Sequence, residues 1–193
     1  MGKRITRVEV QLDSKGIKTL PLAEIKAILR GADDLIMSGG RNLLAKILKG
    51  SKDKKVIELK LDHSPVYGYF KEESIDTITA KIDWLILNHY LAIEYDYRLP
   101  LLVFAPKGWQ IEMDTRTDEF IQEFDAMLNE GRSSFDMTYL KDRDRNMILL
   151  LLDKLKATKD KRYIPILKAW YEIDYNKVRQ RINSVIQALN DGK

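Results

Sequence analysis

The sequence predicts a mainly α-helical protein with one small β element, built from two parts that follow one another along the chain. Apolar residues recur at the spacing of amphipathic helices through most of the 193 residues. Strand-like runs gather mainly at 91–105, and none occurs after residue 118. We therefore expect helices with one hairpin in the first part and helices alone in the second.

A short strand is predicted near the amino end. Val8, Val10 and Leu12 alternate with polar residues and a turn follows them, so we assign residues 1–20 to an N-terminal strand and extension. Pro21 then opens the first helix, because proline in the first turn of a helix loses no backbone hydrogen bond.

Two further helices are predicted before the hairpin. The break Ser-Gly-Gly at 38–40 precedes an amphipathic helix that Gly50 ends, and Ser74 is a good N-cap for a helix with an unbroken apolar stripe. Between them, residues 54–61 fit both an alternating strand and a helical turn, so their structure stays open. Three helices followed by a hairpin are the element order of a winged helix, which we place at 21–115.

The second part, 118–193, is predicted to be an all-helical module, with the domain boundary near 115–117. Its last two helices, at 163–171 and 176–189, resemble one HEAT repeat, with a proline early in the first helix and Val-Arg opening the second. The predicted fold class is therefore mainly α with a small β wing, a winged helix followed by a short HEAT-like helical module.

The composition excludes several functional classes. With no cysteine, the chain has no disulfide, iron–sulfur cluster or cysteine-based zinc site, and we expect a reducing, cytoplasmic compartment. No apolar run approaches the roughly 18 residues of a membrane span, so no membrane partner is expected. His63 and His89 lack acidic residues at ligand spacing, and paired carboxylates such as Asp142 and Asp144 lie among basic residues. We therefore expect no metal, no cofactor and no enzymatic activity.

Positive charge is mild overall but concentrated in two stretches. The net charge is +4, yet residues 41–60 hold seven basic against two acidic side chains, and residues 154–181 hold nine against three. Such a surplus is typical of surfaces that bind phosphate, although charged runs also occur as solvated surface. The sequence therefore indicates one basic patch in each part.

Four short segments of the first part carry a resemblance to a known family. They are Gly-Arg-Asn-Leu-Leu at 40–44 with Ile-Leu-Lys-Gly-Ser at 47–51, Val-Tyr-Gly at 66–68, Asn-His-Tyr-Leu at 88–91 and Phe-Ala-Pro-Lys-Gly at 104–108. In this order they resemble the RQC domain, the winged helix that lies carboxy-terminal to the catalytic core of RecQ-type DNA helicases. A Gly-x-x-x-x-Gly-Lys-Thr phosphate loop and a helicase core are missing, so the chain looks like a stand-alone bacterial RQC-type DNA-binding protein.

The resemblance implies that Lys49, Ser51 and Lys55 hold duplex phosphates and that Lys71 makes a further phosphate contact. Lysine side chains displace counterions from phosphate and a serine hydroxyl fixes register, which agrees with these roles. Ser74 opens a helix whose N-terminus attracts anions. The candidate nucleic-acid-binding residues are Arg41, Lys49, Ser51, Lys54, Lys55, Lys71, Ser74, Tyr97 and Arg98.

The hairpin tip departs from the family pattern. The resemblance implies an aromatic or apolar wedge that separates the terminal base pair, and the matching position here is Arg98, flanked by Tyr97 and Leu99. Tyr97 suits stacking on an exposed base, whereas Arg98 suits a groove or a phosphate. We therefore expect binding of structured duplex DNA without strand separation.

Basic residues also occur in the helical module. Two interpretations of them stay open, a second nucleic-acid grip on the one hand and a solvated edge or protein-docking surface on the other. The residues of this candidate second basic surface are Lys161, Arg162, Lys177, Arg179 and Arg181.

Together these patterns predict a non-enzymatic DNA-binding protein that recognises duplex ends, forks or branched DNA through the winged helix. An accessory role beside a DNA helicase or a repair enzyme is expected, because the motor itself is missing. Two alternatives stay open. The first is an RNA or ribonucleoprotein binder, and the second is a protein-interaction scaffold that acts through the helical module.

Overall fold

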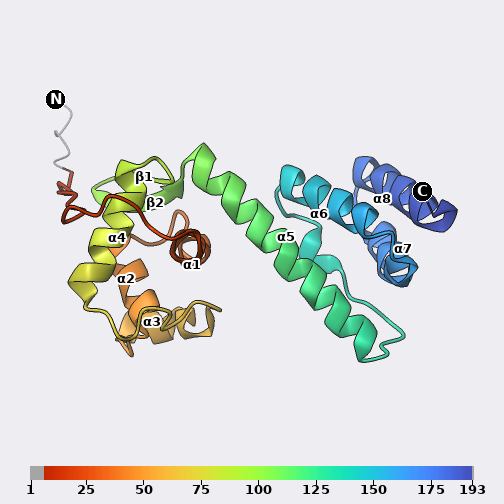
Figure 1. The fold of residues 1–193 in the computed structure, drawn as a ribbon, viewed down its shortest axis with the longest axis horizontal. Helices are drawn as coiled ribbons and strands as arrows, with labels where there is room; N and C mark the ends of the chain where they lie inside the picture. Colours follow the sequence, from red (N-terminus) through yellow and green to blue (C-terminus); the bar gives the residue numbers. More distant parts are fainter. Residues whose placement is uncertain (1–6, 193) are drawn as a thin grey trace. The chain divides into compact units, whose positions relative to one another are not determined.

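The computed structural model describes residues 7–192, which form α-helices, short 3₁₀ helices and one two-stranded sheet (Figure 1). The chain divides into two compact units, Met1–Glu112 and Met113–Lys193. The predicted fold class, mainly α with a small β wing, is confirmed. In the described part of the chain, no helix is both long enough and apolar enough to cross a membrane.

Three helices form the body of the first unit. They are α1 (Leu22–Asp33), α2 (Arg41–Lys49) and α4 (Ile75–Leu87), and each buries one apolar face. Leu44 and Ile47 are fully buried because they recur at helical spacing on one side of α2, which packs against both α1 and α4. The central position of α2 fixes where its carboxy-terminal end, and the loop that follows, reach the surface.

The segment that the sequence left open is helical. It forms α3 (Lys54–Glu58), followed by the 3₁₀ helix η1 (Leu61–His63). Asp53 caps α3, since its carboxylate accepts a hydrogen bond from the backbone N–H of Lys55 at 3.0 Å. Val56 is fully buried and attaches this short helix to the core.

The wing is a hairpin of β1 (Leu91–Asp96) and β2 (Leu99–Phe104), as predicted. Antiparallel pairing continues to the last residue of β1, so Tyr97 and Arg98 alone form the turn. Tyr97 has a φ of +56°, because a two-residue hairpin turn needs a left-handed residue at its first central position. Leu102 is fully buried and anchors β2 to the helical body.

The strand predicted at 8–12 is wrong, because these residues are irregular. The backbone N–H of Val8 donates to the carbonyl of Arg98 at 3.2 Å, and the Tyr95 hydroxyl donates to the carbonyl of Val8 at 3.0 Å. Alternation of apolar residues produces a strand only where a neighbouring strand offers a ladder of hydrogen bonds. Residues 1–6 of the predicted extension lie outside the described residues.

A continuous helix, α5 (Pro106–Asn129), joins the two units. It runs through the boundary predicted near 115–117, and the division between the units falls at Glu112 and Met113. The assignment of domains therefore stays a prediction, and the predicted boundary lies within a helix.

The second unit is all-helical, as predicted. Helices α6 (Arg145–Thr158) and α7 (Ile164–Ile173) both pack against α8 (Asn176–Asp191), and Trp170 and Ile182 are fully buried. The likeness of the last two helices to a HEAT repeat stays a prediction. With the end of α5, the elements of this unit are η2 (Thr138–Leu140), α6 (Arg145–Thr158), η3 (Lys161–Tyr163), α7 (Ile164–Ile173) and α8 (Asn176–Asp191).

Candidate nucleic-acid interface

Two glycine turns of the first unit lie against each other, one after α2 and one before α4. Gly50 has a φ of +74°, and a Cβ on it would lie 3.0 Å from the Cα of Gly68. Two backbone hydrogen bonds hold the turns together. The N–H of Gly68 donates to the carbonyl of Ile47 at 2.9 Å, and the N–H of Phe70 donates to the carbonyl of Leu48 at 2.8 Å. Close packing of backbone therefore explains both the Lys-Gly-Ser and the Tyr-Gly segments.

Lys49, the last residue of α2, reaches across this contact. Its ammonium group donates hydrogen bonds to the backbone carbonyl oxygens of Lys71 and Glu73, the latter at 2.8 Å. Both acceptors are neutral and an ammonium has three donors, so the charge and one donor stay available for a phosphate. The fold thereby brings together Lys49 and Lys71, which are 22 residues apart in sequence.

Ser51 opens the loop that leads into α3. Its hydroxyl accepts a hydrogen bond from the backbone N–H of Asp53 at 3.2 Å, and the Asp53 carboxylate accepts one from the Lys46 ammonium at 2.7 Å. The hydrogen bond from Lys46, helped by the one from the Lys55 backbone, lowers the pKa of Asp53 below its usual value. Ser51 thus holds the loop in place from a half-buried position.

Three predicted lysines are exposed at the two turns. The side chain of Lys54 is 87 % exposed, with its ammonium 3.5 Å from Glu58, and that of Lys71 is 75 % exposed, 3.9 Å from Glu72. Lys55 is exposed on the same short helix as Lys54. Exposed ion pairs of this kind contribute less than about 1 kcal/mol, so a phosphate displaces the carboxylates at little cost.

Ser74 is the N-cap of α4. Its hydroxyl accepts a hydrogen bond from the backbone N–H of Thr77 at 3.1 Å and lies 2.9 Å from the hydroxyl of the same residue. The first turn of α4 also carries the exposed acidic residue Asp76. These contacts give Ser74 a structural role at the start of the helix, with one negative charge beside it.

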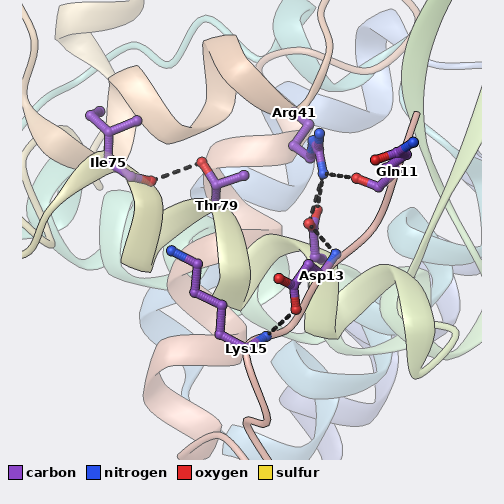
Figure 2. Close-up of polar contacts among 7 residues, drawn as sticks. Gln11, Asp13, Lys15, Arg41, Ile75 and Thr79 are labelled. Atoms are coloured by element: carbon purple, nitrogen blue, oxygen red, sulfur yellow. Dashed lines mark hydrogen bonds and ion pairs between the residues drawn. The ribbon is translucent and has the colours of Figure 1, made fainter. Parts of the chain in front are cut away.

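Arg41 differs from the exposed lysines, because it forms an internal ion pair (Figure 2). Its Nη1 donates to both carboxylate oxygens of Asp83 at 2.7 Å and to the carbonyl of Gln11 at 2.9 Å. The Asp83 carboxylate also accepts a hydrogen bond from the backbone N–H of Asp13 at 2.9 Å, and its side chain is only 3 % exposed. Arg41 therefore ties the amino-terminal segment to α2 and α4.

The wing tip presents both of its predicted residues to solvent. Tyr97 is 76 % exposed and Leu99, which follows the turn, is 62 % exposed. Arg98 is exposed as well, and its backbone carbonyl accepts the hydrogen bond from Val8. An exposed ring of this kind offers a stacking face to an unpaired base.

A groove of about 390 Å³ lies between the start of α2, the wing and the amino-terminal segment. Its lining includes Arg41, Lys46 and Lys55 beside residues 8–10 and 100–102. The sequence reasoning missed Lys46, although this lysine lies within the basic run at 41–60. The sequence did not predict the ion pair of Lys46 with Asp53, which lies seven positions away.

Lys81, in α4, is a further residue that the sequence did not single out. Its ammonium lies 2.8 Å from Glu24 and 2.6 Å from Glu73, and only 11 % of its side chain is exposed. Burial acts to lower the pKa of Lys81, but the hydrogen bonds to the two carboxylates outweigh burial and the net pKa is raised. Lys81 therefore fixes Glu73, whose carbonyl accepts from Lys49.

The sequence of the chain matches one protein family and one curated protein. The model of the RQC domain matches residues 22–120, which is about half of the chain. The chain belongs to the RQC domain family. Within curated proteins, 69 residues are 33 % identical to the ATP-dependent DNA helicase RecQ of Bacillus subtilis (strain 168). The match covers 36 % of this chain and 12 % of that helicase, and no solved structure matches the chain.

The RQC match contains all the candidate residues of the first unit and confirms the resemblance inferred from the four segments. An RQC domain is a DNA-binding domain and not a catalytic one, so DNA binding is the function that the family supports. Among residues 7–192, no group of three or more His, Cys, Asp or Glu side chains is arranged to hold a metal ion.

The candidate second basic surface lies outside the RQC match and is not gathered in one place. Lys161 donates to the carbonyl of Asn190 at the carboxy-terminal end of α8, whereas Lys177 lies in the first turn, about 20 Å away along the helix. Three members have internal partners, since Arg162 pairs with Asp160, Arg179 donates to the carbonyl of Glu172 and Arg181 pairs with Asp153. These five residues are therefore divided between η3 and α8.

Proposed function

We propose that this protein is a non-enzymatic DNA-binding protein that holds duplex phosphates at the two glycine turns of its RQC domain. The supporting observation is the position of Lys49, whose ammonium joins the end of α2 to the turn that carries Lys71 and binds only neutral carbonyls among the described residues. Lys54 and Lys55 on α3 and Lys71 in the turn before α4 are all exposed. Together they form the duplex grip, Lys49, Lys54, Lys55 and Lys71.

The DNA that suits this grip is a duplex end, a fork or a branched junction. Tyr97 at the exposed wing tip offers a stacking face for the last base, which only an end or a junction presents. Arg98 stands where a wedge is implied, which favours binding without strand separation. We place such a protein in the cytoplasm, as an accessory to a DNA helicase or repair enzyme, because the B. subtilis relative is a DNA helicase.

The test is a triple variant, Lys54→Ala/Lys55→Ala/Lys71→Ala, which spares Lys49 because its hydrogen bonds hold the turns together. We expect weaker binding of a labelled forked DNA. The slope of log K against log salt should fall by about 2.7, since each duplex phosphate contact contributes about 0.9. Fluorescence anisotropy titrations from 50 to 300 mM salt measure both quantities.

The matched control is Lys18→Ala/Lys156→Ala/Lys168→Ala, which removes the same charge at exposed positions that belong to neither turn. Equal fork binding by the two triple variants would reject the duplex grip. Titration of a structured RNA of the same shape belongs beside the DNA, and tighter binding of the RNA would replace DNA as the proposed partner.

A further inference from the structure

A second groove, of about 520 Å³, lies entirely in the second unit and outside the RQC match. It forms where the first turns of α6 and α8 meet the loop after η2. Ile148 and Val178 contribute apolar surface to it. Its basic lining residues are Lys141, Arg143, Arg145 and Lys177.

The two carboxylates that line the groove are engaged in internal hydrogen bonds. Asp174, which is 4 % exposed, accepts from the indole N–H of Trp170 at 2.7 Å and from the backbone N–H of Tyr175 at 2.6 Å. Asp142 accepts from the Tyr175 hydroxyl at 3.2 Å. These contacts hold Asp174 and Asp142 in place and position Tyr175 at the edge of the groove.

The basic residues of the groove make few hydrogen bonds to other residues. Arg145 and Lys177 are exposed, and neither makes a hydrogen bond or ion pair with another described side chain. Arg143 donates one hydrogen bond through Nε to the carbonyl of Tyr139 at 3.2 Å, which leaves its other guanidinium donors. Four basic side chains line this groove against two carboxylates, so positive charge exceeds negative charge there.

Tyr175 supplies a flat apolar surface beside these charges. It is 58 % exposed, and the ammonium of Lys141 lies 5.2 Å from its ring centroid. A basic groove with an exposed aromatic ring is the arrangement that binds single-stranded nucleic acid, since the cations follow the phosphates and the ring stacks on a base. A duplex hides the faces of its bases within the stack, so the ring favours a single strand.

We propose that this groove is a single-strand site, in which Arg145 and Lys177 bind phosphates and Tyr175 stacks on an unpaired base. The site is separate in its residues from the duplex grip and does not depend on it. Deoxyribose and ribose strands share this chemistry, and the two are distinguished by measurement.

The test uses the full chain with labelled dT15 and rU15 in titrations from 50 to 300 mM salt, with the affinities of variants compared at 50 mM. Arg145→Ala/Lys177→Ala should lower the slope of log K against log salt by about 1.4, since each single-strand phosphate contact contributes about 0.7. Tyr175→Ala should weaken binding by about 5- to 150-fold, the range measured for base stacking. Tyr175→Phe keeps the ring and should bind within about 2-fold of the parent, although it loses the hydrogen bond to Asp142.

The controls separate this site from the duplex grip. Lys156→Ala/Lys168→Ala removes two exposed charges elsewhere in the second unit and should bind dT15 like the parent. The variant Lys54→Ala/Lys55→Ala/Lys71→Ala should weaken binding of a blunt duplex and keep dT15 binding, whereas Arg145→Ala/Lys177→Ala and Tyr175→Ala should weaken dT15 binding and keep binding of the blunt duplex. Thermal melts confirm that each variant is folded.

Three results would overturn the single-strand site. The first is a parent chain that binds neither dT15 nor rU15, and the second is equal affinity of Tyr175→Ala and Tyr175→Phe. The third is displacement of dT15 by a ten-residue glutamate peptide that binds as tightly as dT15 does. That result would identify the groove as a site for acidic peptides.

Discussion

The carboxylate of Asp83 is nearly withdrawn from water, and its charge is balanced by the guanidinium of Arg41. The backbone N–H of Asp13 satisfies one further lone pair of the carboxylate. Removal of one partner of such a pair costs more than removal of both, because the remaining charge stays buried without compensation. The stability of the first unit therefore depends strongly on Arg41, which the sequence predicted as a nucleic-acid-binding residue.

Arg41→Ala should lower the free energy of unfolding by about 3 kcal/mol, the low end of the range for broken buried pairs. Urea denaturation measures this value. Arg41→Ala/Asp83→Ala should recover part of the loss, and Lys54→Ala, which breaks only an exposed pair, should change stability by less than about 0.5 kcal/mol. A double variant no more stable than Arg41→Ala would contradict this account of Asp83.

In the second unit, burial raises the pKa of the Tyr163 hydroxyl to about 12, and the hydrogen bond that it donates to Asp125 at 2.7 Å acts in the same direction. The folded state thus keeps the proton that the unfolded state loses near pH 10. The stabilisation is complete below pH 10 and disappears as the pH rises toward 12.

The parent chain should therefore lose stability between pH 10 and pH 12 more steeply than Tyr163→Phe, which has no phenolic proton. Urea unfolding at pH 9, 10, 11 and 11.5 gives the two slopes. Tyr171→Phe, which changes a tyrosine whose ring contacts Arg179, serves as the comparison. Parallel pH profiles for the parent and Tyr163→Phe would exclude Tyr163 as a source of alkaline unfolding.

Among the elements, the turn between α2 and α3 is the most constrained part of the candidate site. Its glycine, Gly50, has a left-handed backbone, and a Cβ added to it would lie 3.0 Å from the Cα of Gly68 in the second turn. Gly131 also has a positive φ, of +67°, but nothing lies within 4 Å of the Cβ that a side chain would add. Substitution of Gly131 by alanine therefore adds backbone strain alone, whereas substitution of Gly50 adds both backbone strain and a steric clash.

Gly131→Ala should destabilise the chain by about 1 kcal/mol, the cost of a left-handed alanine. Gly50→Ala should cost more than Gly131→Ala, and it should also weaken fork binding, because the clash with Gly68 separates Lys49 from Lys71. Differential scanning calorimetry and anisotropy titration check the two effects. Equal destabilisation by both substitutions would show that the two turns move apart freely.

Local patterns predicted the elements that local chemistry determines. The apolar face of α2, the Ser74 cap and the hairpin all follow from residues within a few positions of each other. The strand at 8–12 failed because a strand needs a partner, which no local pattern contains. At 54–61 the cap at Asp53 favoured the helix over the alternating pattern.

The candidate site was predictable in its charges but not in its contacts. The basic run at 41–60 and the four matching segments located the lysines. The pairing of Arg41 with Asp83, 42 residues away, and the hydrogen bonds of Lys49 to carbonyls more than 20 residues away are products of tertiary packing. The groove around Tyr175 was missed for the same reason, because its lining comes from two stretches that the fold brings together.

At the scale of the whole molecule, the duplex grip and the single-strand site lie in different units with no residue in common. Losses of binding energy at independent sites add. A junction that carries both a duplex arm and a single-stranded arm should therefore lose affinity in both variants and most in their combination.

The measurement compares a fork with a 15-nucleotide single-stranded arm and a blunt duplex of the same paired length. Lys54→Ala/Lys55→Ala/Lys71→Ala should weaken binding to both DNAs, and Arg145→Ala/Lys177→Ala should weaken binding to the fork alone. The combined variant should show the sum of the two free-energy losses within about 0.5 kcal/mol. An unchanged preference for the fork in the groove variant would mean that the arm is bound elsewhere.

The irregular segment at the start of the described chain has a consequence for the order of folding. Its hydrogen bonds join Asp13 to Asp83 across 70 positions and Tyr95 to Val8 across 87 positions. Contacts between such distant residues form slowly, because closing a long loop costs entropy before any contact is gained. During synthesis the segment has no wing to bind until β2 has left the ribosome, so its docking is among the last events in the maturation of the first unit.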